Sequence, residues 1–129
     1  MTKTYASDVK RERRKSLFLQ EITKLIQELA QQEPAIAQVY VSNVDISANT
    51  GICYVYFSSY QEPGEEIFNK ALEFLKLYKP SLRKAFAGRV QTRYAPDLVF
   101  MFDKAKEKER RINDLLNKVQ DELAAEEKA

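Results

Sequence analysis

The stretch QVYVSNVDISANTGICYVYFS, residues 38–58, decides the fold of this chain. Its two ends, residues 38–46 and 52–58, are rich in the β-branched and aromatic side chains that favour strands. The segment between them, SANTG at residues 47–51, supplies side chains that favour turns. Two such segments joined by a short turn predict a β-hairpin.

The first predicted strand changes phase half-way along. Valine stands at positions 39 and 41, but the apolar residues then move to positions 44 and 46. Because side chains alternate between the faces of a strand, this change indicates a bulge or a face switch near Ser42–Asn43. The second strand keeps its phase, with Cys53, Val55 and Phe57 sharing one face.

Helical periodicity precedes the hairpin. A helix is predicted over residues 7–32, because Phe18, Ile22 and Ile26 recur at the spacing of one buried face. This helix should end before Pro34, since proline disfavours helical geometry in the residue before it.

Two shorter helices are expected after the hairpin, over residues 64–79 and 81–91. Pro80 separates them, because it cannot donate a hydrogen bond to the carbonyl of residue 76 and its ring clashes with that group, which costs about 3 kcal/mol in a helix interior. Lys79 and Pro80 should therefore form an interhelical kink. The free amides at the start of the second helix would then favour a bound phosphate beside Lys79, Arg83 and Lys84.

A third strand, Asp97 to Phe102, and a last helix from Lys104 complete the chain. The order predicts an α+β domain with a three-stranded sheet and its helices mainly on one face. We expect one domain over residues 1–129, ordered from about residue 7 to 123, with a basic N-terminal segment and an acidic C-terminal tail. Its core should contain Phe18, Ile22, Ile26, Val55, Phe57, Leu72, Leu75, Phe86, Leu98 and Phe100.

Composition argues against an enzyme. The chain has no histidine and one cysteine, Cys53, so it lacks the residues for histidine-based acid–base chemistry, a thiolate metal site or an internal disulfide. No phosphate-binding glycine loop is present. The longest apolar run, residues 52–57, is far too short to span a membrane. We expect a cytoplasmic protein with no catalytic residues, metal or cofactor and no membrane association.

Charge is distributed unevenly along the chain. Residues 3–15 hold six basic and two acidic residues, and residues 76–93 hold six basic residues and no acidic one. Residues 119–129 hold four acidic residues and one basic one. Basic blocks of this kind attract phosphate backbones or acidic protein surfaces. The candidate binding residues are Lys10, Arg11, Arg13, Arg14 and Lys15 in the first block, and Lys76, Lys79, Arg83, Lys84, Arg89 and Arg93 in the second.

Several strings resemble the ribosome-binding factor A family. VYVSNVDIS at residues 39–47 is similar to the first strand of that family, and CYVYFS at residues 53–58 to its A-x-V-Y-V-S strand. Arg83, Arg93 and the segment PDLVFMFD at residues 96–103 resemble its R…R-x-x-P-x-L-x-F-x-x-D signature. The resemblance covers roughly residues 10–120. Its small-x-Gly kink is Tyr78-Lys79-Pro80 here.

The resemblance implies a single type II KH-like domain that binds the small (30S) ribosomal subunit and its 16S rRNA during late maturation and rRNA processing. It implies a monomer without chemistry of its own, with assembly GTPases as candidate partners. The alternative is a basic protein–protein adaptor that docks on an acidic partner without direct RNA binding.

Overall fold

The predicted hairpin forms the first two strands of the sheet. In the computed structural model, which describes residues 2–92 and 94–128, β1 (Val39–Ile46) pairs antiparallel with β2 (Ile52–Ser59). Their register shifts between Val41 and Asn43, which confirms the predicted bulge. The register then continues to the pair Ile46 and Cys53.

The third strand, β3 (Asp97–Phe102), runs parallel to β2 and gives the sheet order β1-β2-β3. Parallel strands need a long crossover, and α2 (Gly64–Val90) supplies it. Gly64 begins this helix in a tight space, because a Cβ atom there would lie 2.9 Å from Ser59 Oγ. The end of β2 and the start of α2 are therefore packed so closely that residue 64 has little room for a side chain.

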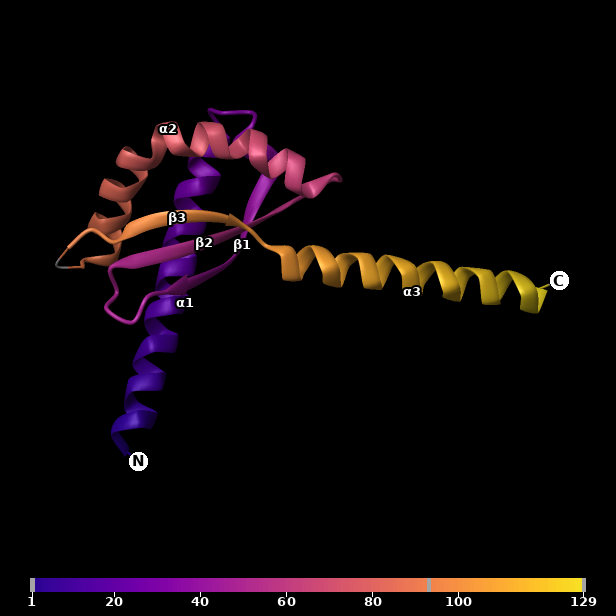
Figure 1. Ribbon diagram of the computed structural model, residues 1–129, viewed down its shortest axis with the longest axis horizontal. Coiled ribbons are helices and arrows are strands. Elements are labelled where there is room, and N and C mark those ends of the chain that lie inside the picture. Colours follow the sequence, from indigo (N-terminus) through magenta and orange to yellow (C-terminus); the bar gives the residue numbers. More distant parts are fainter. Residues whose placement is uncertain (1, 93, 129) are drawn as a thin grey trace.

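Two helices cover one face of the sheet. α1 (Thr2–Ala30) crosses behind the strands and packs on β1, while α2 arches over β2 and β3 (Figure 1). A short 3₁₀ helix, η1 (Ile36–Gln38), connects α1 to β1. The α+β architecture with helices on one face is confirmed.

The core lies between the sheet and the two helices. Eight of the ten residues predicted for it are buried, and the other two, Leu72 and Phe100, are partly buried against it. Cys53, Val55 and Phe57 of β2 are all 0% exposed, so the central strand forms the floor of the core. Phe18 of α1 and Phe86 of α2 meet above this floor edge to face, with ring centroids 5.0 Å apart.

The predicted boundary at Pro80 is wrong. Residues 64–90 form one helix, and Pro80 lies inside it. The ribbon of α2 nevertheless changes direction part-way along (Figure 1). Proline is a recognised cause of such a bend, because it lacks the N–H that would bond to the carbonyl of residue 76 and its ring pushes against that carbonyl. The chain thus bends without interrupting the helix.

Helix α3 (Lys104–Lys128) projects away from the sheet (Figure 1). Asp103 fixes its start: one carboxylate oxygen accepts the amide of Lys106 at 2.9 Å, and the other accepts the hydroxyl of Ser42 at 2.6 Å. Arg110 adds hydrogen bonds to the carbonyls of Ser59 and Tyr60 at 3.0 and 2.9 Å. In the part of the chain that the structure describes, no helix has the length and apolar character needed to cross a membrane.

The Phe18–Phe86 contact yields a test of the core. Phe86→Ala should lower the free energy of unfolding by about 3–5 kcal/mol, because it removes a fully buried ring and leaves a cavity. Leu17→Ala, a neighbour of Phe18 that is 41% exposed, should cost less than about 1 kcal/mol. Urea unfolding followed by circular dichroism measures both, and similar losses would contradict the assigned core.

The buried thiol of Cys53 makes stability depend on alkaline pH. Burial, with a smaller contribution from Asp45, raises its pKa from 9.0 to about 12. The unfolded chain ionises this thiol above pH 9 and the folded chain does not, so the thiol's contribution to stability falls as pH rises from about 9 to 12.

Comparison with Cys53→Ala isolates that contribution. The stability difference between the native chain and Cys53→Ala should shrink by roughly 1–2 kcal/mol between pH 8 and pH 10.5, since one unit of pKa shift corresponds to about 1.4 kcal/mol. Urea unfolding at both pH values measures the difference. A difference independent of pH would show that the thiol ionises freely in the folded chain.

Candidate nucleic-acid interface

Five of the candidate cations form no ion pair with a residue that the structure describes. Lys76 and Lys84 on α2 are exposed, and so are Lys10 and Arg13 on α1. Lys15 is partly buried. None of these five forms an ion pair or side-chain hydrogen bond with a residue that the structure describes. Their charges are therefore available to an anionic partner.

Two other cations of the second block form ion pairs within the protein. Lys79 pairs with Asp97 of β3 at 3.3 Å. Arg89 pairs with Glu21 and Glu28 of α1, at 3.5 and 3.1 Å. A cation that is already paired has less charge to offer a phosphate, so both residues are weaker binding candidates than Lys76 and Lys84.

Arg83 and Arg93 complete the second block. The guanidinium of Arg83 donates to the carbonyl of Ala95 at 3.0 Å, so it braces the link between α2 and β3 while it remains exposed. Arg93 lies outside the described residues. Lys84 follows directly on α2 and points its charge into solvent.

The first block also contains both cations with a partner inside the protein and cations without one. Arg11 donates to the carbonyl of Ile46 at 2.7 Å and lies 3.7 Å from the carboxylate of Asp45. Arg14 donates to the hydroxyl of Thr50 at 2.9 Å. These two arginines fasten α1 to the end of the hairpin. Lys10, Arg13 and Lys15 of this block form no ion pair with a described residue.

The free amides expected after Pro80 do not exist. Because α2 continues through Pro80, the amides that follow it lie inside a helix and not at a helix N-terminus. A phosphate near Lys79, Arg83 and Lys84 would thus meet side chains alone. The bend of α2 still affects the direction in which these side chains point.

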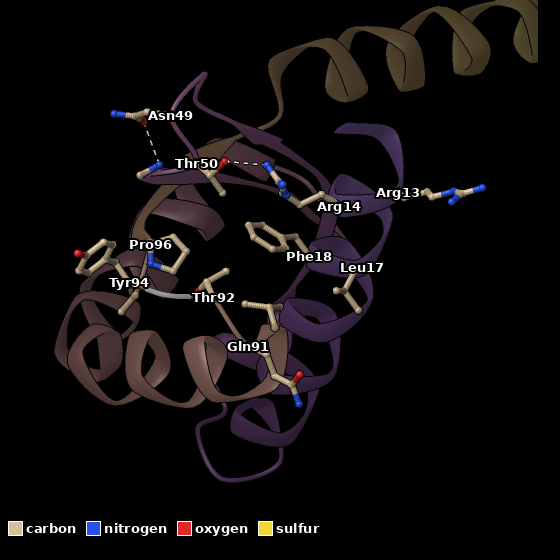
Figure 2. A pocket seen from close by; sticks show the side chains of 13 residues that line it. Arg13, Arg14, Leu17, Phe18, Asn49, Thr50, Gln91, Thr92, Tyr94 and Pro96 are labelled. Carbon is tan, nitrogen blue, oxygen red and sulfur yellow. Dashed lines mark hydrogen bonds between the residues drawn. The ribbon is translucent and has the colours of Figure 1, made fainter. Parts of the chain in front are cut away.

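A pocket of about 600 Å³ lies beside Arg13 and Arg14 of the first basic block. Arg13, Arg14, Leu17 and Phe18 of α1 line one side, and the α2–β3 link and the hairpin turn line the others, as Figure 2 shows. Apolar walls with arginines at the rim suit a group that has both an apolar face and a negative charge.

Three residues of this pocket were missed by sequence reasoning. Gln91 ends α2 in the left-handed conformation, with φ 52° and ψ 44°, and turns the chain toward β3. Thr92 follows, and its hydroxyl is buried without a hydrogen-bond partner among the described residues. Thr50 holds Arg14 from the hairpin turn. Nothing in the sequence indicates the pocket, because its walls come from three segments far apart in the chain.

Comparison with known proteins identifies relatives over most of the chain. Residues 10–116 match the family described as Ribosome-binding factor A. The chain is 28% identical over 114 residues to ribosome-binding factor A of Shewanella frigidimarina, which covers 88% of this chain and 79% of that protein. It is 31% identical over 91 residues to the Halothermothrix orenii protein, covering 70% of this chain and 73% of that one.

Solved structures share the fold. The crystal structure of ribosome-binding factor A from Thermus thermophilus superposes with a TM-score of 0.59 at 24% identity, covering 70% of this chain and 92% of that one. A homology model of the Thermus thermophilus protein, fitted into a cryo-EM map of its complex with the 30S subunit, gives a TM-score of 0.51 at 24% identity, covering 68% and 93%. With the family match over residues 10–116, this chain belongs to the ribosome-binding factor A family.

Proposed function

We propose that this protein is a cytoplasmic, non-enzymatic assembly factor that binds the small ribosomal subunit through 16S rRNA during late maturation and rRNA processing. Family membership supports the ribosome as its target. The observation that carries direct RNA binding is the set of exposed cations without an internal partner on α1 and α2.

The arrangement of charge supports rRNA as the ligand. Phosphate contacts dominate the affinity of proteins for nucleic acids, and free lysine and arginine side chains supply them. The pocket adds apolar walls beside Arg13 and Arg14, which suit an unpaired nucleotide of a single-stranded segment. This combination favours an exposed rRNA strand over a regular duplex.

The proposal extends to how the protein acts. One copy of the folded domain binds each subunit as a monomer, changes no covalent bond, and leaves when assembly GTPases remodel the subunit. The alternative is an adaptor whose basic surface meets an acidic protein. Ribonuclease treatment separates the two: material that stays bound to the tagged protein after RNA digestion favours the adaptor.

Neutralising the free cations tests the binding surface. The triple variant Arg13→Gln, Lys76→Gln and Lys84→Gln should weaken binding to 30S subunits, and each lost phosphate contact should reduce the slope of log affinity against log salt by about 0.7–0.9. Stability should change little, because none of the three is paired within the described structure. Co-sedimentation with 30S subunits at several salt concentrations measures the effect.

One control and one further variant complete that experiment. Lys70→Gln removes an exposed charge from α2 outside the proposed site and should leave the slope unchanged. Exchanging the central cluster Arg83, Lys84, Arg89 and Arg93 for glutamine should also weaken binding. If 30S binding survives that exchange, the site assignment is wrong.

The part that Pro80 plays in the bend of α2 can be tested in the same assay. Pro80→Ala restores a donor to the carbonyl of residue 76, so the helix should gain stability, by at most about 3 kcal/mol. If the bend aims the cations of α2, 30S binding should weaken by roughly fivefold or more, which corresponds to about 1 kcal/mol. Ser81→Ala is the matched control at an exposed neighbouring position. Unchanged binding would show that the bend has no role in recognition.

A further inference from the structure

An exposed aromatic side chain lies where β2 ends, beside the first turns of α3. Tyr60 directly follows β2 and is 62% exposed. Its ring packs on that of Tyr40 in β1, with the ring centroids 4.8 Å apart and the ring planes tilted by 45°. An aromatic ring that is supported by a neighbour and still largely open to solvent offers a surface on which a flat group can stack.

Arg110 of α3 fixes the position of this ring. Its guanidinium donates to the carbonyl of Ser59 at 3.0 Å and to the carbonyl of Tyr60 at 2.9 Å. The backbone N–H of Tyr60 donates to the carbonyl of Gln38 at 3.3 Å, so the backbone of residue 60 is held on both sides. Carbonyl groups carry no net charge, so Arg110 keeps its positive charge beside the ring.

A pocket of about 390 Å³ lies between the two tyrosines and α3. Lys106 and Arg110 line it with positive charge, and Glu109, Asn113 and Asp114 line it with hydrogen-bond acceptors. Unpaired bases are held by stacking on aromatic rings and by hydrogen bonds to their edges, while cations hold the adjoining phosphates. This pocket contains all three kinds of group.

The surface around the start of α3 is positively charged. Residues 104–111 hold five basic residues and two acidic ones. One of the acids, Glu107, is buried, and its carboxylate lies 3.7 Å from Nε of Arg111, so it adds little negative charge to the surface. Three exposed lysines here form no ion pair with a described residue: Lys104, Lys106 and Lys108. This charge favours a polyanion over a basic protein as the occupant of the pocket.

We propose that Tyr60 is the stacking platform of a second RNA-binding site, which takes one unpaired base of a single-stranded segment. The base stacks on the open face of Tyr60, and its adjoining phosphates lie beside Lys106 and Arg110. Asp114 accepts hydrogens from an amino group of the base, which adenine, cytosine and guanine have and uracil lacks. The inference rests on the proposed binding of 16S rRNA, and it adds a contact that shares no residue with the basic blocks of α1 and α2.

A tryptophan at position 60 tests the stacking directly. The native chain has no tryptophan, so Tyr60→Trp places a single fluorophore with a large ring in the site. Titration with hexaadenylate RNA should quench its fluorescence, and hexauridylate should quench it less at the same concentration. Leu123→Trp, at an exposed position near the far end of α3, should not be quenched. Equal quenching at positions 60 and 123, or none at position 60, overturns the proposal, and equal quenching by the two RNAs overturns the part assigned to Asp114.

Binding to 30S subunits tests whether the site is used on the proposed target. Tyr60→Ala should weaken co-sedimentation by roughly five- to 100-fold, which is the loss of one stacked base expressed as an affinity ratio. Tyr60→Phe keeps the ring and should bind like the native chain. Lys106→Gln should reduce the slope of log affinity against log salt by about 0.7, while Lys118→Gln, an exposed charge further along α3, should leave it unchanged.

The outcomes separate this site from the proposed function. If the native chain does not bind 30S subunits, the proposed function fails, and the fluorescence titration still decides whether Tyr60 stacks on RNA. If the native chain binds and Tyr60→Ala binds equally well, the second site is wrong and the proposed function stands. Weakened 30S binding by Tyr60→Ala without any quenching by RNA would show that Tyr60 contacts a protein, which also overturns the proposal.

Discussion

One constraint governs this structure: a single face of β2 must be covered by two helices, of which α1 precedes the hairpin in the sequence and α2 follows it. Cys53, Val55 and Phe57 on that face are fully buried, and the two helices share the sheet, with α1 packing mainly on β1 and α2 mainly on β2 and β3. The helices meet where Phe18 packs edge to face on Phe86. Because this contact fixes α1 against α2, it also fixes the two basic blocks that the helices carry relative to each other.

The same packing divides the basic residues into two roles. Where α1 lies against α2, Arg89 of α2 is drawn into ion pairs with Glu21 and Glu28. Where the end of the hairpin approaches α1, Arg11 and Arg14 hydrogen-bond to it. Cations that face away from these contacts, such as Lys76 and Lys84, keep their charge for a partner. Within one basic run of the sequence, some cations therefore form contacts inside the protein and others stay available for binding.

Helix α3 differs from α1 and α2 because its apolar side chains are exposed. Its amphipathic pattern resembles those of α1 and α2, yet its apolar side chains stay in solvent because Asp103 and Arg110 direct it away from the domain. The core on the covered face of the sheet is already closed by α1 and α2, so α3 is not needed to complete it. Its apolar stripe therefore stays exposed.

The sequence by itself determined the α+β class, the hairpin, the bulge after Val41 and nearly all of the core, because these follow from the alternation of apolar residues within short segments. Only the tertiary structure decided that α2 continues through Pro80, which basic residues are paired, and where the pocket lies. The pairing of the cations and the pocket depend on contacts between segments distant in the chain, such as Lys79 with Asp97 and Arg14 with Thr50. Local periodicity carries no record of such contacts, since they form only when the whole core packs.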